Sequence, residues 1–216
     1  MDLVKAYHPD TRSMSSGQVL SDAYTFEKAR TVIQEMADEV ALDLLDKGLV
    51  TDQIVLTVGY DVESLTNPAI ASQYHGRITT DYYGRKVPYH AHGTANFDYA
   101  TCSQRIIGEH VRALYDRIVN PALLVRRLTL AINRLVPESE AKKRQKPILL
   151  DLFADYEEIE RQRHEEEAAL ARERNQMLAT LQLRKKFGKN VLLKGINYAE
   201  GATQRERNQQ IGGHKA

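Results

Sequence analysis

Two segments far apart in the chain alternate apolar and polar residues, as a strand with one buried face does. In residues 53–60 (QIVLTVGY), one face carries Ile54, Leu56, Val58 and Tyr60. In residues 123–136 (LLVRRLTLAINRLV), the buried face is expected to carry Leu128, Leu130 and Ile132, and the outer face Arg127, Thr129 and Asn133. A sheet built from such strands buries one face and leaves the other polar.

Two further segments carry apolar residues at helical spacing. The first stripe is Ala29, Val32, Ile33, Met36, Val40 and Leu44, and the second is Ile107, Val111, Leu114 and Ile118. Asp22, Thr25 and Ser103 are candidate N-terminal caps. Gly48 and Asn120-Pro121 are candidate C-terminal ends. The sequence therefore predicts two amphipathic helices.

The order of these elements indicates the fold. An edge strand is expected at 12–20, a loop at 61–75 and one or two strands at 76–97, where Pro88 favours an edge or a bulge. The resulting order is strand, helix, strand, strand, helix, strand, which is the split βαβ pattern. We therefore predict an α+β fold, with two helices on one face of a four-stranded sheet and a polar, partly basic face opposite.

The chain changes character after Pro137. Residues 137–147 read as a linker, and an apolar cluster, PILLDLFADY, follows at 147–156. Residues 156–186 form helical sequence with apolar positions too sparse for a buried stripe, so a long solvated helix is expected. From Arg184 onward, eight Lys and Arg stand against two Glu, a local charge of +6. This part is predicted to be a flexible basic tail.

Composition excludes several classes of protein. The 216 residues carry a net charge of only +1 and one cysteine, Cys102, which rules out an intrachain disulfide. The sequence shows neither an apolar run of membrane-spanning length nor a signal-peptide core. The expected location is cytoplasmic.

Longer stretches resemble one protein family. RSMSSGQVL, TFEKAR and GLVTDQIVLTVGYD resemble the start of the little-finger domain of bacterial Y-family translesion DNA polymerases, in the UmuC-like branch. YYGRKVPYHAHGT and LLVRRLTL resemble its later strands, and FGKNVLLKGINYAEGATQRERNQQIGGHKA resembles the C-terminus of that branch. The implied layout is a linker remnant (1–11), a little finger (12–137), a linker (138–155), a charged helix (156–188) and a basic tail (189–216).

The resemblance implies contacts with the phosphate backbone of primer–template DNA. The implied residues are Ser13, Ser15, Ser16, Gly17, Arg77, Arg85, Lys86, His90, His92, Arg126 and Arg127. Such contacts position a protein on DNA without reading its sequence. The alternatives are an ordinary solvated sheet face and, for the serines, an edge-strand turn.

The apolar cluster has its own counterpart in the family. Leu149, Leu150, Asp151, Leu152 and Phe153 resemble the peptide by which bacterial polymerases bind the sliding clamp. Leu149 stands where Gln is usual in that peptide. The alternative is that the cluster packs on its own domain.

Catalysis is not expected of this chain alone. In the family, acidic residues of a palm domain hold two Mg²⁺ ions, and no such segment stands here, so Mg²⁺ is expected only in a palm domain and the parent protein would be a DNA-directed DNA polymerase. His90 and His92 share a strand face, but zinc needs three or four ligands, so no metal or other cofactor is predicted. The alternative function is a stand-alone, non-catalytic protein that competes for the clamp or for damaged DNA.

Overall fold

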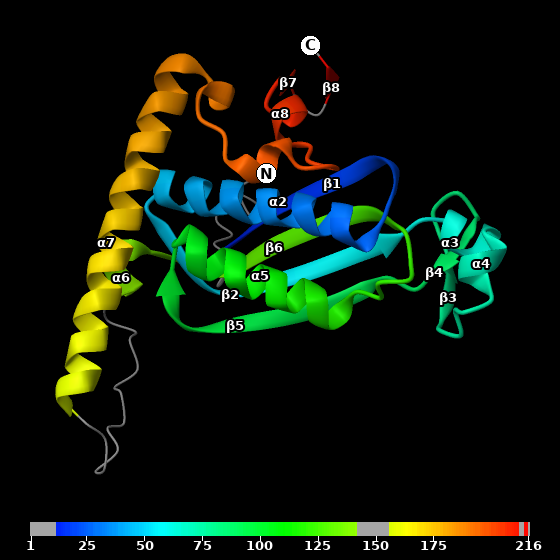
Figure 1. Ribbon diagram of the computed structural model, residues 1–216, viewed down its shortest axis with the longest axis horizontal. Coiled ribbons are helices and arrows are strands. Elements are labelled where there is room, and N and C mark those ends of the chain that lie inside the picture. Colours follow the sequence, from blue (N-terminus) through cyan, green and yellow to red (C-terminus); the bar gives the residue numbers. More distant parts are fainter. Residues whose placement is uncertain (1–11, 142–155, 212–213, 216) are drawn as a thin grey trace, which may run out of the picture.

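The computed structural model describes residues 12–141, 156–211 and 214–215. Its centre is an antiparallel sheet in the order β1–β6–β2–β5 (Figure 1). The strands are β1 (Arg12–Tyr24), β2 (Leu49–Tyr60), β5 (Ala91–Thr101) and β6 (Val125–Pro137). Two helices, α2 (Phe26–Asp46) and α5 (Gln104–Ile118), cover one face of this sheet. The predicted α+β class, with two helices on one face of a four-stranded sheet, is confirmed.

The first strand is longer than predicted. β1 continues to Tyr24, so Asp22 lies inside the strand, and Thr25 occupies the N-cap position of α2 without a side-chain capping bond. At α5 the prediction holds, because the Ser103 side chain accepts a hydrogen bond from the amide of Ile106. Gly48, with φ of +62°, follows the C-cap of α2 in the left-handed conformation that glycine adopts at little cost.

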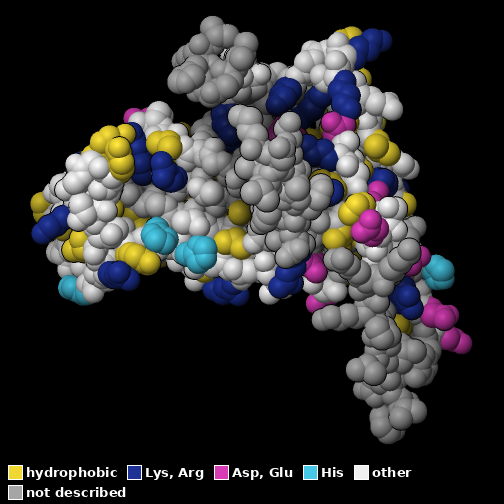
Figure 2. All heavy atoms as spheres, turned by 180° about the vertical axis from the view of Figure 1, so that it is seen from behind, with side chains coloured by type: hydrophobic (Ala, Val, Ile, Leu, Met, Phe, Trp, Pro, Cys, Tyr) yellow, Lys and Arg dark blue, Asp and Glu magenta, His cyan; other side chains and the backbone are white. Residues whose placement is uncertain are grey.

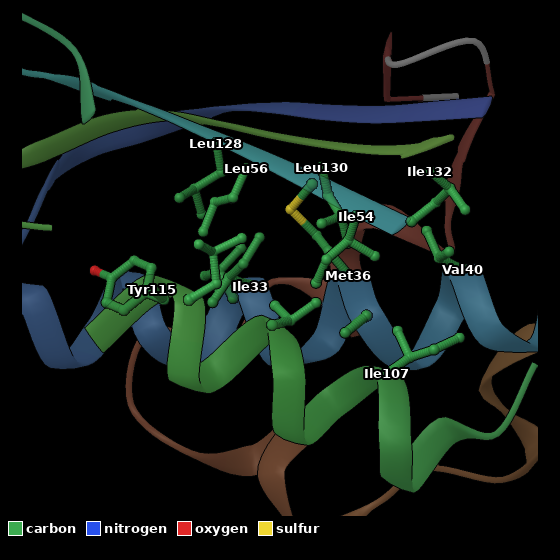
Figure 3. Close-up of a cluster of buried hydrophobic side chains, with 14 of the residues drawn as sticks. Ile33, Met36, Val40, Ile54, Leu56, Ile107, Tyr115, Leu128, Leu130 and Ile132 are labelled. Carbon is green, nitrogen blue, oxygen red and sulfur yellow. The ribbon is translucent and has the colours of Figure 1, made fainter. Parts of the chain in front are cut away.

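The core lies between the sheet and the two helices. Figure 3 shows side chains of β2 and β6 pointing toward those of α2 and α5. The labelled residues are Ile33, Met36, Val40, Ile54, Leu56, Ile107, Tyr115, Leu128, Leu130 and Ile132. Every residue of the two predicted helical stripes is buried except Ile118, which is partly buried. Each large side chain buried in this way contributes about 1.5–3 kcal/mol.

Two glycines lie where α5 approaches its neighbours closely. A Cβ atom on Gly93 of β5 would lie 2.9 Å from Cγ2 of Ile118. A Cβ atom on Gly108 of α5 would lie 2.5 Å from Nε2 of Gln34 on α2. Both distances are shorter than a carbon contact allows. Gly93 faces the β-branched side chain of Ile118, so glycine is needed for this spacing of α5 against the sheet, whereas the Gln34 side chain beside Gly108 is flexible and can move away.

A small lobe separates β2 from β5. Residues 61–90, the hairpin lobe, contain α3 (Glu63–Thr66), α4 (Pro68–Ala71), β3 (Ile78–Thr80) and β4 (Lys86–Pro88). The predicted loop at 61–75 thus holds two short helices, and the predicted strand region at 76–97 divides into a hairpin and the start of β5. The buried Ser64 accepts from the amide of Leu124 at 3.0 Å. This contact anchors the lobe, which projects from one end of the sheet in Figure 1.

The long helix α7 (Tyr156–Phe187) docks on the domain, whereas the sequence predicted a solvated helix. Met177 is buried, and Glu173 accepts hydrogen bonds from the Ser103 hydroxyl at 2.7 Å. Arg174 makes two bonds of 2.8 Å with Glu138, which belongs to α6 (Glu138–Ala141). Sparse apolar spacing concealed this contact, because most of it is ionic. None of the helices in the described ranges combines the length and apolarity needed to span a bilayer.

The basic tail also folds, although it was predicted to be flexible. Its elements are η2 (Lys189–Val191), η3 (Gly195–Tyr198), α8 (Gln204–Arg207), β7 (Gln210–Ile211) and β8 (His214–Lys215). Glu35 of α2, only 2% exposed, accepts from the Asn197 side chain at 2.7 Å and from the amides of Thr203 at 2.8 Å and Gln204 at 3.1 Å. A buried carboxylate needs such donors, so Glu35 holds the tail against α2.

Replacing Glu35 with Gln should loosen the tail. The amide group of Gln is neutral and turns an N–H₂ toward donors, so unfolding should require about 1–3 kcal/mol less free energy. Hydrogen exchange at the amides of Thr203 and Gln204 should speed up strongly, whereas exchange at the core amide of Ile107 should change less. Glu27→Gln is the control, because Glu27 lies on the same helix with its side chain 77% exposed. Equal melting temperatures for the two variants would contradict this role of Glu35.

Candidate nucleic-acid interface

The face of the sheet turned away from α2 and α5 has a floor of small and polar side chains. The register places Gly17 of β1, Thr129 of β6, Thr57 of β2 and His92 of β5 in one row. The neighbouring row is Ser15, Ala131, Val55 and Thr94. We call these eight residues the open face. In the first row, the Thr57 hydroxyl lies 2.9 Å from Nδ1 of His92.

Three amide side chains form a ladder beside the open face. The side-chain amide of Gln53 donates to the side-chain oxygen of Asn96 at 2.8 Å. The side-chain amide of Asn133 donates to the side-chain oxygen of Gln53 at 3.3 Å. The ladder crosses β6, β2 and β5. It uses the side-chain nitrogen of Asn133, the side-chain oxygen of Asn96, and both the oxygen and the nitrogen of the Gln53 amide. These amides are therefore already engaged with one another.

A groove of about 600 Å³ lies where the open face meets the hairpin lobe. Its lining includes Thr57, Gly59, His90, Arg126 and Arg127. Figure 2, which looks at the molecule from behind the sheet, shows Lys, Arg and His side chains gathered where the lobe joins the body. The groove thus brings residues of β2, β6 and the lobe to one place.

The cations around this groove differ in how much of their charge is already neutralised. Arg85 bonds Asp81 at 2.7–2.8 Å, and Arg126 lies 3.7 Å from Asp61. Arg127 is exposed, and among the described residues it has no ion-pair partner. A Cβ atom built on Gly59 would lie 3.3 Å from Cβ of Arg127, so the side chain of Arg127 begins directly over the strand backbone.

The model of the impB/mucB/samB family C-terminal domain matches residues 11–147. The chain belongs to the impB/mucB/samB family. The match confirms the resemblance to the C-terminal, little-finger region of UmuC-like Y-family polymerases. A search of curated proteins finds no significant match.

In this impB/mucB/samB domain, a row of rings connects the lobe to the open face. The Arg77 guanidinium lies 4.3 Å from the centre of the Tyr89 ring, and Tyr89 stacks on His90 at 4.3 Å. His90 and His92 meet edge to face at 6.4 Å. Within the parts of the chain that the structure describes, no three His, Cys, Asp or Glu side chains could hold a metal ion together.

The residues that the resemblance implied are not all on one surface. Four of them lie on or beside the open face: Ser15, Gly17, His92 and Arg127. Three line the groove: Arg85, His90 and Arg126. Arg77 and Lys86 belong to the lobe, and Ser13 is exposed at a bulge of β1. Ser16 has the same strand parity as Met14 and Leu20, which pack on the core, so it faces the helix side. Residues 149–153 lie outside the described residues.

Sequence analysis missed two aromatic residues of this family domain. Tyr82 and Tyr83 line the groove from the tip of the β3–β4 hairpin, and the amide ladder was also not expected. The signal for the tyrosines was present in RITTDYYGRKVPYH, where aromatic and basic residues interleave.

Asp81 fixes the tip of this hairpin. Its Oδ1 atom accepts from the amides of Tyr83 and Arg85 at 2.9 Å, and its Oδ2 atom accepts from Arg85 Nε at 2.8 Å. Gly84, with φ of +78°, completes the turn. Removal from water would raise the pKa of Asp81, but the hydrogen bonds from the Arg85 guanidinium and the two amides outweigh this and hold the pKa below its usual value.

The lowered pKa of Asp81 predicts an acid-sensitive turn. The stabilisation is complete above the ordinary carboxyl pKa of about 3.9 and disappears as pH falls through the lower pKa of the folded state. The amide chemical shifts of Tyr83 and Arg85 should therefore change only below about pH 3.9. Asp81→Ala should shift both amides at neutral pH, whereas Asp81→Asn keeps an acceptor oxygen and should shift them less. Unchanged shifts in Asp81→Ala would contradict this account of the turn.

Proposed function

We propose that this chain is the DNA-gripping, clamp-tethering part of a translesion DNA polymerase. It binds the backbone of primer–template DNA through the open face and the adjacent groove, and synthesis belongs to a palm domain. The observation that carries the proposal is the position of Arg127, an exposed cation without a carboxylate partner in the described chain, on a floor of small polar residues beside the groove. Family membership supports the same reading.

The polar floor favours phosphate contacts over base reading. Asn and Gln recognise adenine by two hydrogen bonds at once. Gln53, Asn96 and Asn133 are tied to one another and lack free amide pairs for this purpose. Thr57, Thr129 and Ser15 offer short hydroxyls, which bond phosphate oxygens regardless of the base. The expected binding is therefore independent of sequence, as a polymerase requires.

The proposed DNA contact can be tested by changing Arg77, Lys86 and Arg127 to Ala together. Arg85 is kept, because it holds the turn at Asp81. Binding to duplex DNA of any sequence should weaken to a similar extent. The log–log dependence of affinity on salt should become shallower by about 0.9 for each lost phosphate contact. Affinity is measured by fluorescence anisotropy over a series of salt concentrations.

A matched control removes the same charge elsewhere. Arg112 of α5 and Arg163 and Arg172 of α7 are exposed and belong to helices. Changing these three to Ala should leave the salt dependence almost as it is. If the control flattens the slope and the first variant does not, the DNA surface is elsewhere.

The clamp contact is proposed for Leu149–Phe153, because an extended peptide with exposed Leu and Phe can fill an apolar pocket of a partner. Helices α6 and α7 flank this segment in the sequence. Glu138 of α6 and Arg174 of α7 hold the two flanking helices together through two hydrogen bonds of 2.8 Å.

Changing Leu152 and Phe153 to Ala should abolish clamp binding in a titration and leave the melting temperature almost unchanged. Restoring the usual residue by Leu149→Gln should tighten binding by about 1 kcal/mol, the contribution of one hydrogen bond. If the cluster were part of the core instead, Leu152→Ala alone would cost about 2–5 kcal/mol of stability. A lowered melting point together with unchanged clamp affinity would refute the clamp contact.

A further inference from the structure

Two aromatic side chains at the tip of the hairpin lobe are almost fully exposed. Tyr82 is 96% and Tyr83 77% accessible, and their rings meet edge to face at 5.5 Å. Adjacent exposed aromatic side chains form a contiguous apolar patch, and such patches mark contact sites. Both rings line the groove that Arg127 borders.

The backbone beneath these rings is fixed. The side chain of Asp81 binds the amides of Tyr83 and Arg85, and the amide of Asp81 donates to the carbonyl oxygen of Arg85 at 2.9 Å. The closed turn thus holds both tyrosine side chains in the solvent. Because the backbone is already ordered, a ligand would not have to order it on binding. Tyrosine has few side-chain torsions, so ordering the rings also costs little entropy.

The surroundings of the two rings are cationic. The Arg85 guanidinium lies 5.2 Å from the centre of the Tyr83 ring. Lys86 follows on β4, and Arg127 lies across the groove. Asp61 and Asp81 also line the groove, but Asp81 is bonded to Arg85, and Asp61 faces Arg126 and accepts from the amide of Glu63. An anionic ligand with flat rings fits this combination.

We infer that Tyr82 and Tyr83 form a stacking platform for unpaired bases of single-stranded DNA. The inference rests on the proposed function, because it assigns the unpaired part of a primer–template to the groove end of the same surface. Proteins that bind single strands combine a basic groove with aromatic rings on which bases stack. Bases inside a duplex are already stacked on one another, so the platform distinguishes unpaired from paired DNA.

Fluorescence provides a direct test, because the chain contains no tryptophan. Tyr82→Trp introduces a single reporter, which should be quenched by a single-stranded oligothymidylate and much less by a duplex of equal length. Tyr198→Trp is the matched control, since Tyr198 is also exposed, at 65%, and, like Tyr83 at the hairpin tip, has an arginine over its ring, Arg205 at 4.6 Å. Equal quenching of the two reporters by the single strand would overturn the inference.

Affinity provides the second test. Changing Tyr82 and Tyr83 together to Ala should weaken binding of the oligothymidylate by about tenfold for each base that loses its ring, and should leave duplex binding almost unchanged. The same pair changed to Leu keeps apolar bulk without an aromatic face and should bind as weakly as the Ala variant. Full affinity in the Leu variant would show that the tip makes an apolar contact, as with a protein partner, and not a stacking one.

The two proposals fail in different ways. In one case, the unaltered protein binds duplex DNA through Arg77, Lys86 and Arg127, but the Ala and Leu variants of the tyrosines keep full affinity for the single strand. The stacking platform is then wrong, and the proposed contact with duplex DNA is retained. If the unaltered protein binds neither form of DNA, both are wrong.

Discussion

One-sided burial is the constraint on which the rest of this structure depends. α2 and α5 cover one face of the sheet, and Gly93 lets α5 come close enough to close the core. Alternation along β2 and β6 then fixes every second side chain on the opposite face. The threonine, serine and glycine residues of the open face therefore point away from the apolar core. A change in strand register by one residue would exchange the two faces, so the core also fixes the position of Arg127.

Electrostatic function depends on which cations are left after the fold has used the others. Arg85 closes a turn with Asp81, and Arg126 bonds the carbonyl oxygen of Ser21 and faces Asp61. Such pairs shape the lobe and the end of the sheet, and the carboxylate partners offset part of the charge of these two arginines. Arg127, one residue from Arg126 in sequence, lines the same groove but has no carboxylate partner among the described residues.

Much of the fold could be predicted from the sequence because its signals are local. The alternation of Ile54, Leu56 and Val58 and the stripe around Met36 each lie within one element, and the structure buries them as expected. The candidate site was less accessible, since it depends on pairing between elements. Asp81 removes Arg85 from the set of free cations, and strand parity at Met14 turns Ser16 toward the helices. Neither effect is visible in a list of basic and hydroxyl residues.

The buried carboxylate of Glu35 has a consequence for the order in which the molecule assembles. Its donors come from residues 162 to 169 positions later in the chain. While the chain is being synthesised, α2 therefore emerges from the ribosome long before these donors exist, and the carboxylate stays hydrated until they arrive. Contacts of such long range are costly in loop-closure entropy and form late. The sheet and its two helices can thus collapse first, and the tail closes over an already folded surface.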